Sequence, residues 1–189
     1  MIIKRPLILA SKSPRRSQLL TEAGFEFTIQ TKDTEESYPT TLPPSEVPAF
    51  LAEKKATACT EFIKDQEIII AADTIVILND VIYEKPKDKE DAVRILTTLS
   101  GKVHEVITGV CLLAAEQKSI FSGHSKVHFE SISEQEIRYY IDTYQPYDKA
   151  GAYAIQEWLG LCKISKIEGT YANIMGLPVD LVYKYLEAF

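Results

Sequence analysis

The sequence predicts an α/β fold on a mixed β-sheet. Two observations support this prediction: strand-like and helix-like segments alternate along the chain, and its middle is rich in predicted hairpins. The 189 residues suit one domain, or one domain with a smaller lobe. Hydrophobic residues make up 46% of the chain and charged residues 25%, which is the balance of an ordinary globular protein.

The first half of the chain is expected to supply much of the sheet. Apolar or alternating runs predict strands over residues 7–10, 25–30, 68–78 and 81–83. Ser13 followed by Pro14 is typical of a helix N-terminus, with Leu19, Leu20 and Ala23 on the inner face. A second helix is predicted by the apolar stripe over 47–62. The polar segment 31–44 between them is too long for a simple turn and is a candidate lid.

The second half continues the alternation. Asp88 is predicted to cap a helix that ends at Gly101 and turns Ala92, Val93, Leu96 and Leu99 inward. Two paired strands are expected over 104–115 and 119–132. Ser133 and Glu136 form a capping box that opens another helix, and residues 177–189 predict a final amphipathic helix.

Composition also limits the compartment and the partners. Three cysteines, Cys59, Cys111 and Cys162, suit neither a disulfide framework nor a zinc site, so we expect buried, reduced thiols. The first ten residues are too short in apolar content for a signal sequence, and no run reaches the length of a membrane helix. We therefore expect a cytoplasmic protein. A net charge of −6 argues against nucleic acid as a partner, so any phosphate binding must be local.

A basic loop follows the first predicted strand. Residues 11–16 place two hydroxyls and three cations at a helix N-terminus, where free N–H groups and the helix dipole favour an anion. Cations in a first helical turn oppose the dipole, so their presence indicates an anionic ligand. The alternative is a solvated basic turn with Ser13 as a simple cap.

Asp73 is the strongest single candidate for a functional residue. It lies inside the apolar strand 68–78, where an unpaired carboxylate would cost several kcal/mol. Glu35 and Glu36 in the polar loop are candidates to complete a magnesium or manganese site with it. The alternatives are a structural ion pair for Asp73 and solvated surface for the two loop acids.

Lysines supply further candidates, whereas histidines do not. Lys54 and Lys55 interrupt the apolar helical stripe, so one of them faces inward. Lys85 precedes a proline that favours extended geometry, although exposed surface is the alternative there. His104, His124 and His128 lack metal-ligand spacing, and the common glycine-rich nucleotide motifs are missing.

Seven segments together resemble the Maf family of nucleotide pyrophosphatases. In chain order they are LASKSPRR (9–16), ADTIV (72–76), EKP (84–86), LSG (99–101), TGV (108–110), DKAGAYAIQ (148–156) and GLP (176–178). Each segment alone is weakly specific, but their order and spacing span almost the whole chain.

The resemblance implies an inosine triphosphate pyrophosphatase-like fold, in which a single domain over residues 1–189 has two lobes around a central substrate cleft. It implies metal-dependent hydrolysis between the α and β phosphates, with Mg²⁺ or Mn²⁺, and a homodimer. The form of residues 148–156 resembles the branch that acts on dTTP and UTP. Two alternatives stay open: modified pyrimidine nucleotides as substrates, and a nucleotide-binding regulator of cell division with incidental turnover.

By motif position, the resemblance also implies individual roles. Asp73 would be the acid-base residue and, with Glu36, the metal ligand. Phosphate would be held by Lys55, Lys85 and Arg16 beside Ser11, and the base would be selected by Arg15, Thr74 and Gln156. Lys55 is preferred to Lys54 because the family's Leu-Ala-x-x-Lys-Ala pattern falls on residues 51–56. One departure is Glu157-Trp158, where the family pattern has glycine after the glutamine. The resemblance therefore does not determine the shape of the base pocket or the range of accepted pyrimidines.

Overall fold

The predicted α/β class is confirmed. A computed structural model describes residues 5–189; residues 1–4, which begin the segment interpreted as lacking a signal sequence, lie outside the described part. The strands are β1 (Leu7–Leu9), β2 (Phe27–Ile29), β3 (Ile68–Leu78), β4 (Val81–Tyr83), β5 (Val103–Leu113), β6 (Lys118–Phe129) and β7 (Ile164–Glu168). The α-helices are α1 (Pro14–Glu22), α2 (Val47–Ala58), α3 (Lys89–Leu99), α4 (Glu134–Tyr144), α5 (Trp158–Lys163), α6 (Tyr171–Met175) and α7 (Val179–Leu186).

The strands form one mixed sheet in the order β2-β1-β3-β5-β6-β7, with β4 paired to β3. β1 runs parallel to both β2 and β3, whereas β4 is antiparallel to β3 and β7 is antiparallel to β6. Asn79 (φ 52°) and Asp80 (φ 62°) make the two-residue turn from β3 into β4. Asparagine and aspartate tolerate this left-handed conformation, so the predicted hairpin forms where the sequence places it.

The chain divides into two compact units. Unit 1 comprises Met1–Asp73, Thr108–Gly123 and Gly176–Phe189; unit 2 comprises Thr74–Ile107 and His124–Met175. Strands β3, β5 and β6 each contribute residues to both units. The boundary on β3 falls between Asp73 and Thr74, two residues predicted to have different roles.

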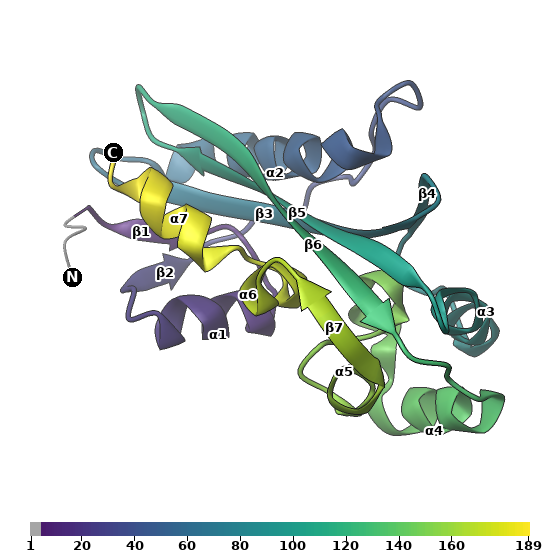
Figure 1. Ribbon diagram of the computed structural model, residues 1–189. Helices are drawn as coiled ribbons and strands as arrows, with labels where there is room; N and C mark the ends of the chain where they lie inside the picture. Colours follow the sequence, from purple (N-terminus) through teal and green to yellow (C-terminus); the bar gives the residue numbers. More distant parts are fainter. Residues whose placement is uncertain (1–4) are drawn as a thin grey trace. The chain divides into compact units, whose positions relative to one another are not determined.

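In unit 1, α2 packs closely on the sheet (Figure 1). Ala52 and Ala56 on the helix join one buried cluster with Ile8 and Ile69 on the strands. A Cβ at Gly109 on β5 would lie only 2.2 Å from the backbone nitrogen of Ala49, so no larger residue fits there. This close approach fixes the helix that carries Lys54 and Lys55.

In unit 2, α3 and α4 pack against each other (Figure 1). Asp88 caps α3 by accepting a hydrogen bond from the Asp91 N–H at 2.8 Å, and the predicted capping box opens α4. On α3, Ile95 faces the core in place of Val93, which was predicted to point inward but is only half-buried. On α1 of unit 1, Ala23 is exposed and the inner face ends at Leu20.

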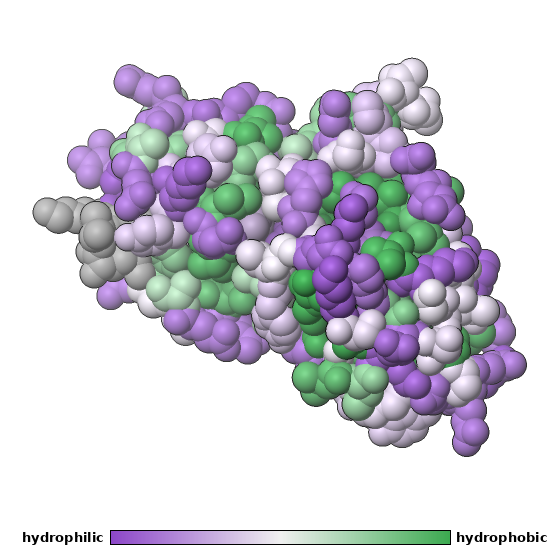
Figure 2. Space-filling view, viewed as in Figure 1, coloured by the Kyte–Doolittle hydropathy of each residue, from purple (hydrophilic) through white to green (hydrophobic). Residues whose placement is uncertain are grey.

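The segment after Gln156 holds most of the structure that the sequence patterns missed, namely α5, β7 and α6. The prediction of three buried cysteines is wrong for Cys162, which lies exposed on α5; Cys59 and Cys111 are buried. Figure 2 shows hydrophobic surface over α5, where Leu161 is 74% exposed. Among the described residues, no helix has the length and apolarity needed to cross a bilayer.

Candidate active site

The basic loop between β1 and α1 is organised by Ser11 rather than by Ser13. Ser13 precedes the helix and Pro14 opens it, as predicted, but the Ser13 side chain makes no capping hydrogen bond. The buried Ser11 Oγ instead accepts from the Ser13 N–H at 3.2 Å and from Arg16 Nη1 at 3.2 Å. The alternative of a simple Ser13 cap is therefore wrong, and Ser11 orients a cation.

Arg16 is held on both sides of its guanidinium. Besides its bond to Ser11, its Nε donates to the Gly176 carbonyl oxygen at 2.8 Å, which joins the basic loop to the segment 176–178. Burial lowers the pKa of Arg16. The nearby carboxylates of Asp73 and Glu36 oppose that shift, whereas the neighbouring charge of Arg15 adds to it. Arginine stays charged at any physiological pH, so the loop presents a fixed, partly desolvated cation close to carboxylates.

Both lysines of α2 contact the polar loop 31–43. Lys54 Nζ donates to Ser37 through the carbonyl oxygen at 3.1 Å and the hydroxyl at 3.0 Å. Lys55 Nζ donates to Glu36 Oε1 at 2.6 Å and to Asp73 Oδ1 at 2.5 Å. The two lysines that interrupt the apolar stripe of α2 therefore both bind the loop: Lys54 anchors it to the helix, and Lys55 joins it to strand β3.

Asp73 lies on β3, is 9% exposed, and is paired with Lys55. The structural ion pair considered as an alternative for Asp73 is thus present. Lys55 also holds Glu36, whose side chain is 48% exposed and comes from a loop. Two carboxylates from separate elements therefore converge on a single ammonium group, which a structural pair alone does not require.

This convergence fits a divalent cation. Mg²⁺ and Mn²⁺ take oxygen ligands from one or two carboxylates and from substrate phosphates. Asp73 and Glu36 offer such oxygens close together, since both carboxylates contact the same Lys55 ammonium group. Within residues 5–189, no group of three or more histidine, cysteine, aspartate or glutamate side chains gathers as metal ligands. A metal here would depend on two carboxylates together with the substrate.

Of the remaining predicted residues, Arg15 lies half-buried on α1 of unit 1, and Thr74, Lys85 and Gln156 belong to unit 2. Thr74 is half-buried and Lys85 is exposed. Glu84, next to Lys85, accepts a hydrogen bond from the Gly151 N–H at 3.2 Å through its carbonyl oxygen, which ties the segment 84–86 to the segment 148–156. Gln156 is half-buried, and its Oε1 is buried with no hydrogen-bond partner among the described residues. Such an acceptor is unusual and suits a ligand donor.

Sequence reasoning missed a buried polar group beside Gln156. Lys149 Nζ lies 2.8 Å from Asp148 Oδ1 and 3.3 Å from Glu157 Oε1, and Glu157 also accepts a hydrogen bond from the Tyr140 hydroxyl. The signal was present as the departure at Glu157, where glycine was expected. Its partner Tyr140 lies on α4 and was not visible from spacing alone.

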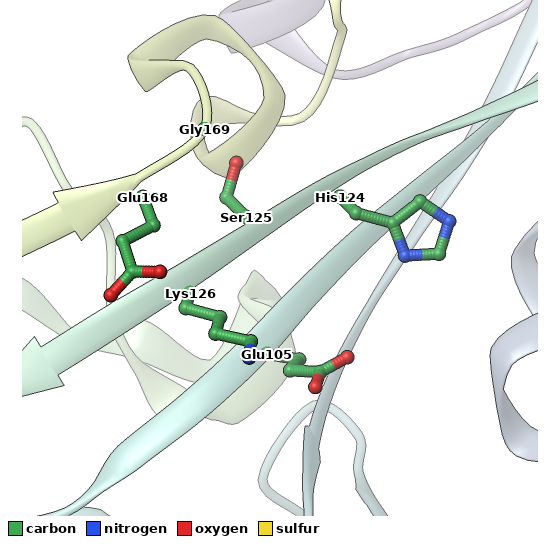
Figure 3. A pocket seen from close by; sticks show the side chains of 6 residues that line it. All are labelled: Glu105, His124, Ser125, Lys126, Glu168 and Gly169. Atoms are coloured by element: carbon green, nitrogen blue, oxygen red, sulfur yellow. The ribbon is translucent and has the colours of Figure 1, made fainter.

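Unit 2 also contains an open pocket of about 240 Å³, shown in Figure 3. It is lined by Glu105, His124, Ser125, Lys126, Glu168 and Gly169, none of which was predicted to act on a substrate. Ser125 points toward the turn at Gly169, while Glu105 and Lys126 lie together on the other side. Charges of both signs line the pocket, so it offers no preference for phosphate.

Comparison with known proteins decides the family. The family model described as Maf-like protein matches residues 6–189. The chain belongs to the Maf family. Relatives from Bacteroides thetaiotaomicron and Porphyromonas gingivalis, both named dTTP/UTP pyrophosphatase, are 45% and 44% identical. These matches cover 97% and 98% of this chain and 96% and 95% of the relatives.

Two further comparisons extend this result. A Cytophaga hutchinsonii protein of the same name is 48% identical over 96% of this chain and 83% of its own length. The solved structure of the Staphylococcus aureus Ham1 protein aligns with a TM-score of 0.56 over 97% of this chain and 99% of that one. At 14% identity this likeness concerns the fold alone. The recognition of the Maf family and the predicted fold class are confirmed.

Proposed function

We propose that this member of the Maf family is a nucleoside triphosphate pyrophosphatase that hydrolyses dTTP and UTP to the nucleoside monophosphate and pyrophosphate. The observation that carries the proposal is the end-to-end likeness to relatives named dTTP/UTP pyrophosphatase, at 44–48% identity. Those names favour an enzyme over a regulator of cell division with incidental turnover. The convergence of Asp73, Glu36 and Lys55 in unit 1 gives the reaction a chemical basis.

In the proposed site, Asp73 and Glu36 would hold a divalent ion, Mg²⁺ or Mn²⁺. Such an ion would supply a more acidic water and neutralise charge on phosphate oxygens. Lys55 lies beside both carboxylates, where its ammonium group can also hold a phosphate oxygen. Asp73 orients the attacking water and accepts its proton.

The cations stabilise the charge that develops on the phosphate oxygens. Arg16 is pre-oriented by Ser11 and Gly176, so little reorganisation accompanies its action. Lys55 and the exposed Lys85 add two further positive charges, which suit the leaving pyrophosphate. Arg16 and Lys55 belong to unit 1, whereas Lys85 belongs to unit 2.

Base selection is assigned to Arg15, Thr74 and Gln156. The free acceptor of the Gln156 amide is matched by the N3–H donor that uracil and thymine share and cytosine lacks. A homodimer and a cytoplasmic location remain predictions, the first measurable by light scattering of the purified protein.

Pyrophosphate release from a nucleotide panel tests the proposal. We expect the largest kcat/KM with dTTP and UTP in the presence of Mg²⁺ or Mn²⁺, and loss of activity with a chelator. The panel should include 5-methyl-UTP and pseudouridine triphosphate, because a larger kcat/KM with these would identify modified pyrimidines as the substrates. Tight binding of dTTP without any product would instead support the regulator.

A further inference from the structure

Glu157 occupies a partly buried position where its side chain makes contacts that a glycine could not make. Its side chain is 18% exposed, accepts a hydrogen bond from the Tyr140 hydroxyl, and pairs with Lys149 at 3.3 Å. The backbone of Glu157 is extended (φ −97°, ψ 176°), so glycine's freedom is not needed there. The departure from the family pattern therefore adds contacts and relieves no strain.

Tyr140 ties together the two residues that flank Ile155 and Gln156. Its fully buried hydroxyl donates to Glu157 and accepts from the Ala154 N–H, which lies 3.1 Å away. Burial, followed by the bond to Glu157, raises the pKa of Tyr140 far above its usual value. The hydroxyl consequently keeps the proton that it donates.

The same segment is held from its other side by its own turn and by α5. The Glu157 N–H donates to the Ala154 carbonyl oxygen at 3.2 Å, closing a tight turn over residues 154–157. α5 starts directly after Glu157, and a Cβ at Gly160 would lie only 2.0 Å from the Ile155 carbonyl oxygen. The backbone that carries Gln156 is thus fixed at both ends.

Lys149 makes this arrangement difficult to break. Its side chain is 9% exposed and lies between the carboxylates of Asp148 and Glu157. Removal of one member would leave a buried charge without its partner, which is strongly unfavourable. The buried ion pair therefore holds Glu157, and through Tyr140 the turn, in one conformation.

We propose that Glu157, acting through Tyr140 and Lys149, is a positioning residue that fixes Gln156 for recognition of the N3–H edge of uracil and thymine. This inference rests on the proposed function. The four-residue turn sets where the Gln156 amide points, and hydrogen-bond readout of a base edge is lost when the amide is misplaced by about 1 Å. A looser turn discriminates less between uracil, which has the N3–H donor, and cytosine, which has an acceptor there.

The test compares kcat and KM for UTP and CTP, measured by pyrophosphate release. In Tyr140→Phe and Glu157→Ala we expect the KM for UTP to rise about tenfold, a smaller change in kcat, and a roughly tenfold lower UTP-to-CTP ratio of kcat/KM. Glu157→Gln keeps an acceptor for Tyr140 but loses the charge, so the ratio should fall only about threefold. Glu134→Gln, which removes an exposed carboxylate from the same helix, is the matched control.

The outcomes separate the inference from the proposed function. Equal losses of kcat/KM for UTP and CTP, or an unchanged ratio in Glu157→Gln, would overturn the positioning role and leave the pyrophosphatase intact. Glu157→Gln is isosteric and decides the question if Glu157→Ala does not fold, as judged by near-ultraviolet circular dichroism. A wild-type enzyme that releases no pyrophosphate from any nucleotide would refute the proposed function itself, and the inference with it.

Discussion

Each unit of the molecule contains a lysine that bridges two carboxylates. In unit 1, Lys55 joins Asp73 to Glu36; in unit 2, Lys149 joins Asp148 to Glu157. The lysine side chains are 18% and 9% exposed, so both charges are largely withdrawn from water. Similar charge arrangements therefore occur where we propose chemistry and where we propose support.

The difference between the two bridges lies in what else holds the carboxylates. Glu157 also accepts from Tyr140, and that hydroxyl is engaged by the Ala154 N–H, so the unit 2 bridge is locked into the backbone. Each bridge has one largely exposed carboxylate, Glu36 at 48% and Asp148 at 59%, so exposure alone does not distinguish them. We propose that the difference is chemical: Glu36 is a metal ligand, whereas Glu157 supports the turn that carries Gln156. A buried ion pair by itself does not indicate function.

The largest expected effect comes from removing the charge of the buried carboxylate in the unit 1 bridge. Asp73→Asn should lower the kcat for UTP at least about 10³-fold, because it removes the proposed metal ligand and proton acceptor together. Pyrophosphate release measures the loss, and circular dichroism checks that the fold is kept. Near-normal turnover would remove Asp73 from the mechanism and leave only its structural pair with Lys55.

Lys55→Met tests whether this bridge serves activity more than stability. We expect kcat to fall about 10²-fold, because the variant lacks the positive charge that stabilises the phosphate oxygens. The free energy of unfolding should also fall, by about 2 kcal/mol, because Asp73, whose side chain is 12% exposed, loses its cation while the half-exposed Glu36 is resolvated. Urea denaturation of the same sample provides the comparison, and a large loss of stability with unchanged kcat would reverse the assignment.

Lys149→Met is the matching change in the locked bridge. It should cost about 2 kcal/mol of unfolding free energy, since Glu157 remains largely buried without its cation while Asp148, 59% exposed, is resolvated. The decrease in kcat should be at least tenfold smaller than in Lys55→Met. Equal effects of the two lysine variants on both quantities would mean that the bridges do not differ as we argue.

Acid should weaken unit 2 by a route that involves neither bridge. Burial, with a smaller contribution from His128, lowers the pKa of His104 to about 3, and its Nε2 pairs with the Tyr153 hydroxyl at 2.8 Å. The unfolded chain binds this proton near pH 6.5 and the folded one does not. The contribution of neutral His104 to the free energy of unfolding is therefore fully present above pH 6.5. It is lost as the pH falls toward 3, by about 1.4 kcal/mol per pH unit.

His104→Phe isolates this contribution, because phenylalanine suits the aromatic surroundings of Phe129 and Tyr153. Unfolding by urea at several pH values between 3 and 7 should show a shallower slope in the variant. Identical slopes would indicate that other groups, and not His104, carry the acid sensitivity.

Local pattern predicted the elements whose signals are dense. Strand β3 begins and ends at the residues that its apolar run indicated, and Asp88 and Ser133 cap the helices that they were expected to cap. The six residues of α5 are too few for a helical period, and β7 alternates with charged residues, so neither stood out. Both depend on packing within unit 2.

The site was predicted in part because some of its signals are violations of a local rule. Asp73 in an apolar strand and Lys55 in an apolar helical stripe are each unfavourable alone and are explained together by their 2.5 Å contact. Their 18-residue separation carries no periodicity, so only the fold pairs them. The link between Tyr140 and Glu157 was hidden for the same reason, since a tyrosine on an amphipathic helix resembles any core residue.

The register of β3 determines which face of the sheet the Asp73 side chain lies on. Pairing with β1 fixes one end of the strand at Ile68–Ile70, and the turn at Asn79 and Asp80 fixes the other. Successive side chains alternate between faces, so deletion of Ala71 or Ala72, between the first anchor and Asp73, would turn Asp73 away from Lys55 and bring a neighbour into its place. Every strand could still form. A change of length at this point would therefore abolish activity without removing a strand, and the lineage of this protein should tolerate changes of length in the loops but not here.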